Sequence, residues 1–200
     1  MKRLGILFVI SAPSGAGKST ICSSLRQTPD TVYAVSCTTR TPRAGETDGE
    51  DYHFMDAADF ERRIAAGDFL EYARVHDHYY GTLRQSIVDT LREGTDVLVD
   101  IDVQGADTIR RSTDPFISDS LVDIFIMPPS LEELRHRLEK RGTESAGQID
   151  FRLTNAAAEM KCWREYKYTI ISGSMEEDLT KFRAITRAER YLSRRIISLE

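Results

Sequence analysis

The chain opens with a short apolar run that leads directly into a glycine-rich turn: Leu4-Gly5-Ile6-Leu7-Phe8-Val9-Ile10-Ser11-Ala12-Pro13-Ser14-Gly15-Ala16-Gly17-Lys18-Ser19-Thr20. Behind the basic start Met1-Lys2-Arg3, the run superficially resembles a signal peptide, but it is too short to span a membrane. We therefore expect a buried strand that feeds a phosphate-binding loop, followed by a helix over residues 21–27.

The glycine-rich turn matches the P-loop pattern in all but its first residue, where Ala12 replaces glycine. Phosphate binding needs converging N–H groups, small residues that let the backbone approach, a lysine and a hydroxyl for Mg²⁺. Pro13 pushes Ala12 to extended backbone angles, which alanine tolerates as well as glycine. An ordinary glycine turn is the alternative. The predicted phosphate-binding residues are Ala12, Pro13, Ser14, Gly15, Ala16, Gly17, Lys18, Ser19 and Thr20.

A second acidic partner is expected at the end of another strand. Asp100 follows the apolar run 97–99, and it is predicted to hold Mg²⁺ together with the Ser19 hydroxyl. Asp102 points to the same side if the extended backbone continues. Alone, Asp100 could be a plain aspartate at a strand end.

Composition limits the classes of protein and of partner. The chain has 200 residues, 40% of them hydrophobic and 30% charged, with a net charge of -5. This excludes fibrous and disordered proteins and allows one large domain with insertions. The acidity predicts neither a nucleic-acid polymer nor a membrane as partner. Cys22, Cys37 and Cys162 are too widely spaced for a disulfide framework or a zinc site, so a cytoplasmic location is expected.

Short apolar runs recur along the chain and alternate with segments of helical periodicity. This alternation predicts an α/β fold, a three-layer P-loop core around a parallel five-stranded sheet. The runs are residues 4–10, 32–35, 97–99, 122–127 and 168–171. From about Leu179 we expect a C-terminal surface helix whose arginines form a solvated basic face: Arg183, Arg187, Arg190, Arg194 and Arg195.

Two segments interrupt the alternation. Residues 36–85 are polar and scatter aromatic side chains without a long helical period, so we expect a small mixed insert. Residues 128–157 form a helical segment, in which an amphipathic helix stops at Gly142. The predicted P-loop core is then residues 1–35, 86–127 and 158–200.

The insert offers a second anion site. Arg40 and Arg43, three residues apart near the rigid Pro42, could form a planar clamp on one phosphate. The alternative is that both arginines are solvated in a loop. This alternative becomes less plausible because hydroxyls and an acid follow in the same insert: Tyr52, Glu71, Tyr80 and Thr82. A second phosphate site is what a kinase needs for its acceptor.

Together these motifs resemble the bacterial guanylate kinases over nearly the whole chain. The P-loop with its alanine is similar to theirs, and so are the following motifs: Thr38-Thr39-Arg40-x-Pro42-Arg43-x-Gly45-Glu46, Gly49-x-x-Tyr52-x-Phe54, Phe69-Leu70-Glu71, Tyr79-Tyr80-Gly81-Thr82 and Asp100-Ile101-Asp102-x-Gln104-Gly105. The resemblance implies a Mg²⁺-dependent enzyme, a monomer or homodimer, that transfers the γ-phosphoryl group of ATP to GMP, and to dGMP, and so supplies GDP.

The resemblance also implies a role for each motif. The P-loop would bind ATP, 36–85 would be the GMP-binding insert, and 128–157 the lid. Catalysis would fall to Lys18, Arg43, Arg137, Arg141 and Arg152. The GMP phosphate would be held by Arg40, Arg43, Tyr52 and Tyr80, and guanine by Ser36, Glu71, Thr82 and Asp102. A carboxylate facing the N–H donors of guanine is left unpaired by adenine, so it discriminates strongly.

The chain departs from the family pattern at a few positions. Cys37 stands where relatives often have serine or histidine, and residues 172–174, Ser-Gly-Ser, replace an Asn-Asp pair that helps to frame adenine. Two other functions remain open. One is a catalytically silent guanylate-kinase-like module that binds proteins, which would be expected to lose Lys18 and the lid arginines. The other is a P-loop kinase with a different phosphorylated acceptor, which would have no use for Glu71 or Asp102.

Overall fold

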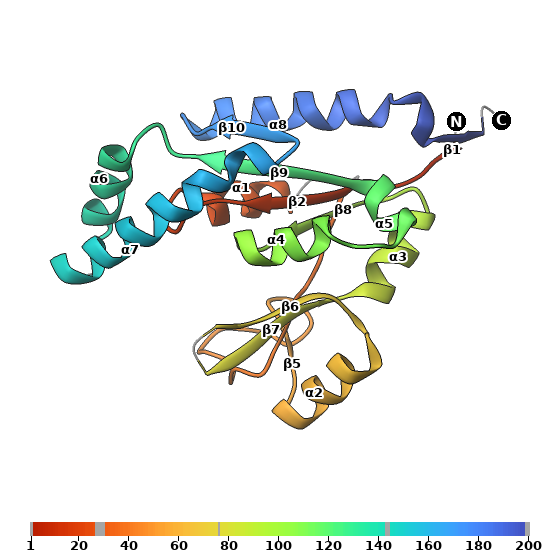
Figure 1. The fold of residues 1–200 in the computed structure, drawn as a ribbon, viewed down its shortest axis with the longest axis horizontal. Coiled ribbons are helices and arrows are strands. Elements are labelled where there is room, and N and C mark those ends of the chain that lie inside the picture. Colours follow the sequence, from red (N-terminus) through yellow and green to blue (C-terminus); the bar gives the residue numbers. More distant parts are fainter. Residues whose placement is uncertain (1, 27–30, 76, 143–144, 199–200) are drawn as a thin grey trace.

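The computed structural model describes residues 2–26, 31–75, 77–142 and 145–198, without the side chains of Ser19 and Arg141. Its central sheet has five parallel strands in the order β10-β9-β2-β8-β3 (Figure 1). The strands are β2 (Leu7–Ser11), β3 (Thr31–Tyr33), β8 (Asp96–Asp100), β9 (Leu121–Met127) and β10 (Tyr168–Ile171). The five apolar runs coincide with them, so the predicted parallel sheet is confirmed.

Helices cover both faces of this sheet, which confirms the three-layer core. On one face, Phe8 and Ile10 pack with α1 (Lys18–Leu25) and α8 (Met175–Arg190). On the other, Leu7 and Val9 pack with three helices, α3 (Arg84–Arg92), α4 (Val103–Arg110) and α5 (Pro115–Ser120) (Figure 1). Successive residues of a strand point to opposite faces, so β2 must be apolar throughout, and it is fully buried.

The order of the strands places the P-loop at a crevice. The chain passes from β2 to β3 and β8 on one side of β2, and then crosses to β9 and β10 on its other side. In open parallel sheets, ligands bind outside the carboxyl ends of the strands at such a switch point. The turn after β2 lies there.

Two helices begin earlier than the sequence predicts. α1 begins at Lys18 because Gly17, with φ 98°, is its left-handed N-cap; its predicted end, residue 27, lies outside the described residues. α8 begins at Met175 because Ser174 and Glu177 form a capping box. Both starts are set by polar or glycine caps, which the apolar periodicity does not register.

A second, four-stranded sheet lies beside α3 and α4 (Figure 1). Its order is β5-β4-β7-β6, with β4 (Cys37–Thr38), β5 (His53–Phe54), β6 (Phe69–Val75) and β7 (His78–Leu83). The segment also holds a helix, α2 (Ala57–Ala66), which the sequence analysis missed. Phe60 is its one buried residue among the described side chains and stacks on Phe69 at 4.3 Å between ring centroids; with 10 residues, the helix is too short to show a long helical period.

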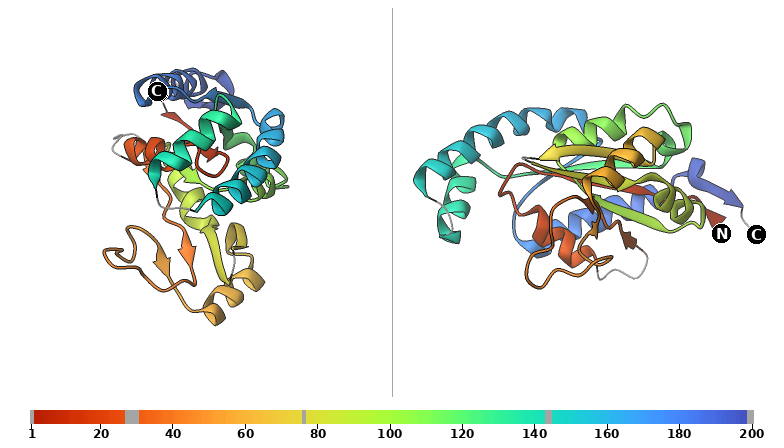
Figure 2. Two further views of the ribbon diagram at one scale, coloured as in Figure 1. Left: turned by 90° about the vertical axis from the view of Figure 1, so that its left-hand side faces the viewer. Right: turned by 90° about the horizontal axis from the view of Figure 1, so that it is seen from below.

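α6 (Leu131–Arg141) and α7 (Ala146–Glu159) pack on each other and project from the sheet as an arm, hereafter the α6–α7 arm (Figure 1, Figure 2). The arm has its own apolar cluster, formed by Leu134, Leu138, Ile149, Leu153 and Ala156. α6 ends at the left-handed Gly142, with φ 64°, so the predicted stop is confirmed.

The C-terminal segment is less exposed than the sequence predicts. A 3-10 helix, Met160–Glu165, precedes β10, and a second one, Ser193–Arg195, follows α8. The next element, β11 (Ile196–Ser198), pairs with β1 (Lys2–Arg3). Arg195 is 2% exposed and bonds Glu189, and Arg190 bonds the buried Asp96. The expected solvated basic face therefore holds for Arg183, Arg187 and Arg194, which are exposed, and is wrong for Arg190 and Arg195, which pair with buried acids. Of the helices described, none has both the length and the apolar character that crossing a membrane demands.

Candidate active site

The backbone of the P-loop forms a cradle for an anion. Gly15 and Gly17 adopt φ angles of 90° and 98°, which favour glycine. Among the described residues, no hydrogen-bond acceptor is seen for the N–H groups of Gly15, Gly17 and Lys18. The N-terminus of α1 adds its dipole to these donors. Ala12 is buried in the core cluster, so its methyl group packs rather than crowds the loop.

The Lys18 amine lies between the P-loop and the end of β8. It forms an ion pair with Asp100 Oδ1 at 2.6 Å and donates to the Ile101 carbonyl at 2.8 Å. Tyr33 donates to the other oxygen of Asp100 at 3.5 Å. The structure therefore brings the predicted lysine and the predicted metal-binding carboxylate together. The side chain of Ser19 lies outside the described residues.

Asp102 lies two residues beyond Asp100 and has a structural task of its own. It is the N-cap of α4, and its Oδ1 accepts the Gly105 N–H at 2.8 Å. One oxygen of Asp102 is thus already engaged. The sequence analysis placed this aspartate beside Asp100 and, through the resemblance, at guanine; it did not predict the cap, which becomes visible only once the helix start is known.

Glu71 is the buried acid of the site. It lies on β6, is 5% exposed, and accepts a hydrogen bond from the Thr82 hydroxyl at 2.6 Å. Burial raises the pKa of Glu71 to about 7, while Thr82 opposes the rise and Asp102 adds to it. A buried carboxylate suits a ligand that offers N–H donors.

Arg40 lies among aromatic side chains at the other end of the same sheet. Its guanidinium carbon is 5.4 Å from the Tyr52 ring centroid, and Tyr52 meets Tyr80 edge-on at 5.9 Å. Glu46, which the sequence analysis did not assign, accepts two bonds from Arg40, at 2.8 and 3.0 Å. Glu46 and then the Tyr80 hydroxyl raise the pKa of Arg40, so its charge is permanent.

The Arg43 side chain is exposed, and no hydrogen bond or ion pair of its guanidinium is seen among the described residues. Its backbone N–H donates to Glu46 at 2.7 Å, so Glu46 ties the two predicted arginines to one turn. The predicted clamp is therefore not assembled in this structure: Arg40 points into the aromatic cluster and Arg43 stays in solvent.

One cavity connects the P-loop with the second sheet. It measures about 180 Å³, and the P-loop lysine lines it together with residues from β6, β7 and the end of β8. Its walls include Lys18, Ser36, Tyr52, Glu71, Tyr80, Asp100 and Asp102. Thr82 donates a hydrogen bond to Glu71, which lines the cavity. Most of the residues predicted for the acceptor thus face the predicted phosphate loop.

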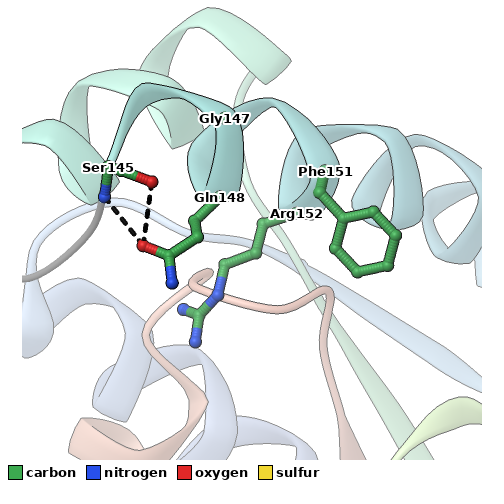
Figure 3. Close-up of a pocket in the computed structure, with 5 residues that line it drawn as sticks. All are labelled: Ser145, Gly147, Gln148, Phe151 and Arg152. Atoms are coloured by element: carbon green, nitrogen blue, oxygen red, sulfur yellow. Dashed lines mark hydrogen bonds between the residues drawn. The ribbon is translucent and has the colours of Figure 1, made fainter.

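The α6–α7 arm brings a further arginine, Arg137, to the P-loop. Arg137 Nη1 donates to the Ala16 carbonyl at 3.3 Å and to Ser172 Oγ at 3.1 Å, while its Nε bonds Glu133 at 2.9 Å. Arg152 projects from α7 on the same side as Gln148 (Figure 3). The side chain of Arg141 lies outside the described residues.

Comparison with known proteins identifies the family. The family model for guanylate kinase matches residues 5–189. Among curated relatives, the guanylate kinase of Caldanaerobacter subterraneus subsp. tengcongensis is 44% identical over 95% of this chain and 90% of its own length. That of Sphingopyxis alaskensis is 44% identical over 100% of this chain and 89% of its own length. The crystal structure of guanylate kinase from Anaplasma phagocytophilum matches with a TM-score of 0.79 and 34% identity, covering 100% of this chain and 93% of that one. The chain therefore belongs to the guanylate kinase family.

Proposed function

We propose that this chain transfers the γ-phosphoryl group of ATP to the phosphate of GMP, and of dGMP, giving ADP and GDP. The observation that carries the proposal is the cavity into which Lys18 of the P-loop and the buried Glu71 both project. A phosphate-binding loop and a base-reading carboxylate at one cavity suit a donor and an acceptor nucleotide placed end to end.

The proposed reaction is an in-line displacement. An oxygen of the GMP phosphate attacks the γ-phosphorus, and the bond to the bridging oxygen breaks as ADP leaves. No general base is required, because the acceptor oxygen is already anionic. The protein must therefore position the two anions and cancel their repulsion.

In this proposal Lys18 and the free N–H groups of the P-loop hold the outer phosphates of ATP, and Arg137, Arg141 and Arg152 of the arm add positive charge around the migrating group. Arg40 and Arg43 hold the GMP phosphate with Tyr52 and Tyr80. Guanine is read by Ser36, Glu71, Thr82 and Asp102. In the same proposal, residues 36–85 are the GMP-binding insert and residues 128–157 are the lid.

The residues present fit a Mg²⁺ ion that arrives with the nucleotide. Among the described side chains, no group of three metal ligands occurs. Mg²⁺ commonly uses one or two carboxylates plus substrate phosphates and water, so Asp100 with Ser19 would suffice. When bound, the ion neutralises phosphate charge. The free thiols of Cys22, Cys37 and Cys162 fit a reducing cytoplasm.

The test is a substrate panel. Purified protein with Mg-ATP is given GMP, dGMP, AMP, CMP or UMP, and formation of the diphosphate is measured. We expect turnover with GMP and dGMP. Turnover of AMP equal to that of GMP would end the guanine assignment. No turnover with any nucleotide would favour the protein-binding module, which the ion pair of Lys18 with Asp100 and the contact of Arg137 with the P-loop speak against.

A further inference from the structure

The α6–α7 arm touches three consecutive residues of the P-loop. Ser14 donates its backbone N–H to Glu159 Oε2 at 3.1 Å. Gly15 lies so close to α6 that a Cβ there would stand 2.7 Å from Leu138 Cδ2. Ala16 accepts the bond from Arg137 already described. A carboxylate, an apolar side chain and a guanidinium thus hold one side of the loop.

Among these contacts, the one from Glu159 is made by a partly buried carboxylate. Burial raises the pKa of Glu159, and the Ser14 N–H opposes the rise more than Lys18 does. Lys18 is engaged by Asp100, and among the described residues Glu159 forms no ion pair. The hydrogen bond between Ser14 and Glu159 is itself exposed to solvent, so it adds little to the stability of the fold, and its main effect is to hold the edge of the loop.

The contact also divides the donors of the loop into two groups. The N–H of Ser14 is taken by Glu159, and that of Ala16 by the Pro13 carbonyl at 3.0 Å. The N–H groups of Gly15, Gly17 and Lys18 have no acceptor among the described residues. Glu159 thus satisfies the donor at the edge of the cradle and leaves the others aimed at the anion site.

Glu159 is the last residue of α7, and Arg152 lies seven positions earlier, two turns along the same face. Gln148 lies on this face as well, and Figure 3 shows Gln148 and Arg152 pointing to the same side of the helix. Because the helix is stiff, the bond between Glu159 and Ser14 also constrains the direction in which Arg152 leaves α7.

We propose that Glu159 is a positioning residue for phosphoryl transfer: by accepting the Ser14 N–H, it fixes the edge of the P-loop and the orientation of α7 at once. The inference rests on the proposed function. What matters is the reach and the acceptor oxygen of the side chain, not its charge. Glu159 does not touch the reacting atoms and acts through Ser14 and Arg152.

Two substitutions separate reach from charge. Glu159→Gln keeps the length and an acceptor oxygen but removes the charge. Glu159→Asp keeps the charge but is one methylene shorter. We expect Glu159→Asp and Glu159→Ala to lower kcat roughly tenfold, the scale of a lost hydrogen bond, and Glu159→Gln, which keeps the bond, to stay within about threefold of the parent. The KM for GMP should not change, because Glu71 and Arg40 lie elsewhere.

Glu139→Ala is the matched control. Glu139 is an exposed glutamate of the same arm, 3.9 Å from Arg135, and an ion pair of this kind is worth little. Its kcat should stay within about twofold of the parent. A fall of less than about fivefold in Glu159→Asp, or a fall in Glu159→Gln as large as in Glu159→Asp, overturns the proposal. So does a rise in the KM for GMP in place of a lower kcat.

Amide hydrogen exchange of Ser14 gives a readout that needs no turnover. The N–H should be protected in the parent and in Glu159→Gln, and it should exchange faster in Glu159→Asp and Glu159→Ala. Equal exchange in all four proteins overturns the proposal even if kcat changes. If the parent makes no GDP, the proposed function has failed, and the exchange measurement still decides whether Glu159 holds the P-loop.

Discussion

Glu71→Gln should weaken guanine recognition and stabilise the unliganded protein at the same time. Glu71 is 5% exposed, and burial raises its pKa from 4.5 to about 7. The site therefore keeps a carboxylate in surroundings that disfavour its charge. We attribute this to guanine, whose N–H donors need the ionised form.

The sign of the effect on catalysis follows from the protonation state. Below its pKa, Glu71 is protonated and offers a donor where guanine also offers donors. We expect kcat/KM for GMP to rise about tenfold per pH unit up to about pH 7 and then to level off. Glu71→Gln should remove this dependence and lower kcat/KM about a hundredfold at pH 8, the scale of leaving two polar groups mismatched.

Stability changes with pH in the opposite direction to kcat/KM. The folded protein holds a proton on Glu71 between pH 4.5 and about 7, where the unfolded chain has lost it. The free energy of unfolding should therefore fall as pH rises through this window, and it should be lower above the window than below it. At 1.36 kcal/mol per pH unit, the fall is at most roughly 3 kcal/mol.

Two measurements check both effects on the same pair of proteins. Denaturant unfolding at pH 5 and pH 8 should show the fall in the parent but not in Glu71→Gln. The GMP phosphate titrates in assays of both proteins, so it contributes equally to both pH profiles of kcat/KM. The difference between the two profiles therefore reports the titration of Glu71. A variant that keeps kcat/KM within about tenfold at pH 8, or that loses stability with pH as the parent does, would refute the reasoning.

Three further substitutions test other parts of the site. Lys18→Ala should lower kcat by at least about a hundredfold with the fold intact by circular dichroism, and a fall of less than about tenfold would contradict its role at the phosphates. Arg43→Ala should cost as much although its side chain is exposed here, because closing on GMP must recruit it; kinetics with GMP at saturation check this, with the same limit of about tenfold. Gly15→Ala should destabilise the protein by about 1–3 kcal/mol, since its φ of 90° and the nearby Leu138 oppose a Cβ; thermal unfolding measures this, and an unchanged midpoint contradicts it.

The local chemistry of the P-loop could be predicted from sequence because its parts are contiguous. A buried strand, glycines at left-handed positions and the lysine after them all lie within residues 7–18. The same holds for the stop of α6 at Gly142, which one residue determines. α2 could not be predicted from a long helical period, because it has only 10 residues and Phe60 is its only buried residue among the described ones.

Contacts between distant segments could not be predicted in this way. Glu46 shares its carboxylate with Arg40 and the Arg43 backbone, and no pattern in the sequence marks that choice. A Glu or Gln in the last turn of a helix gives no warning that it will reach a loop 145 residues away, as Glu159 does. The pairing of Arg190 with the buried Asp96, 94 residues earlier, likewise depends on which acid the fold brings to it.

The sequence by itself determined the five strands of the central sheet, the glycine-rich turn and the set of chemical groups, because hydrophobic periodicity and glycine angles act over a few neighbouring residues. Only the tertiary structure decided which groups line one cavity, which oxygen of Asp102 accepts the hydrogen bond of a helix cap, and which side chain accepts the Ser14 N–H. Burial and hydrogen-bond partners are properties of segments packed in three dimensions, and they set the pKa of Glu71 and the direction of each donor.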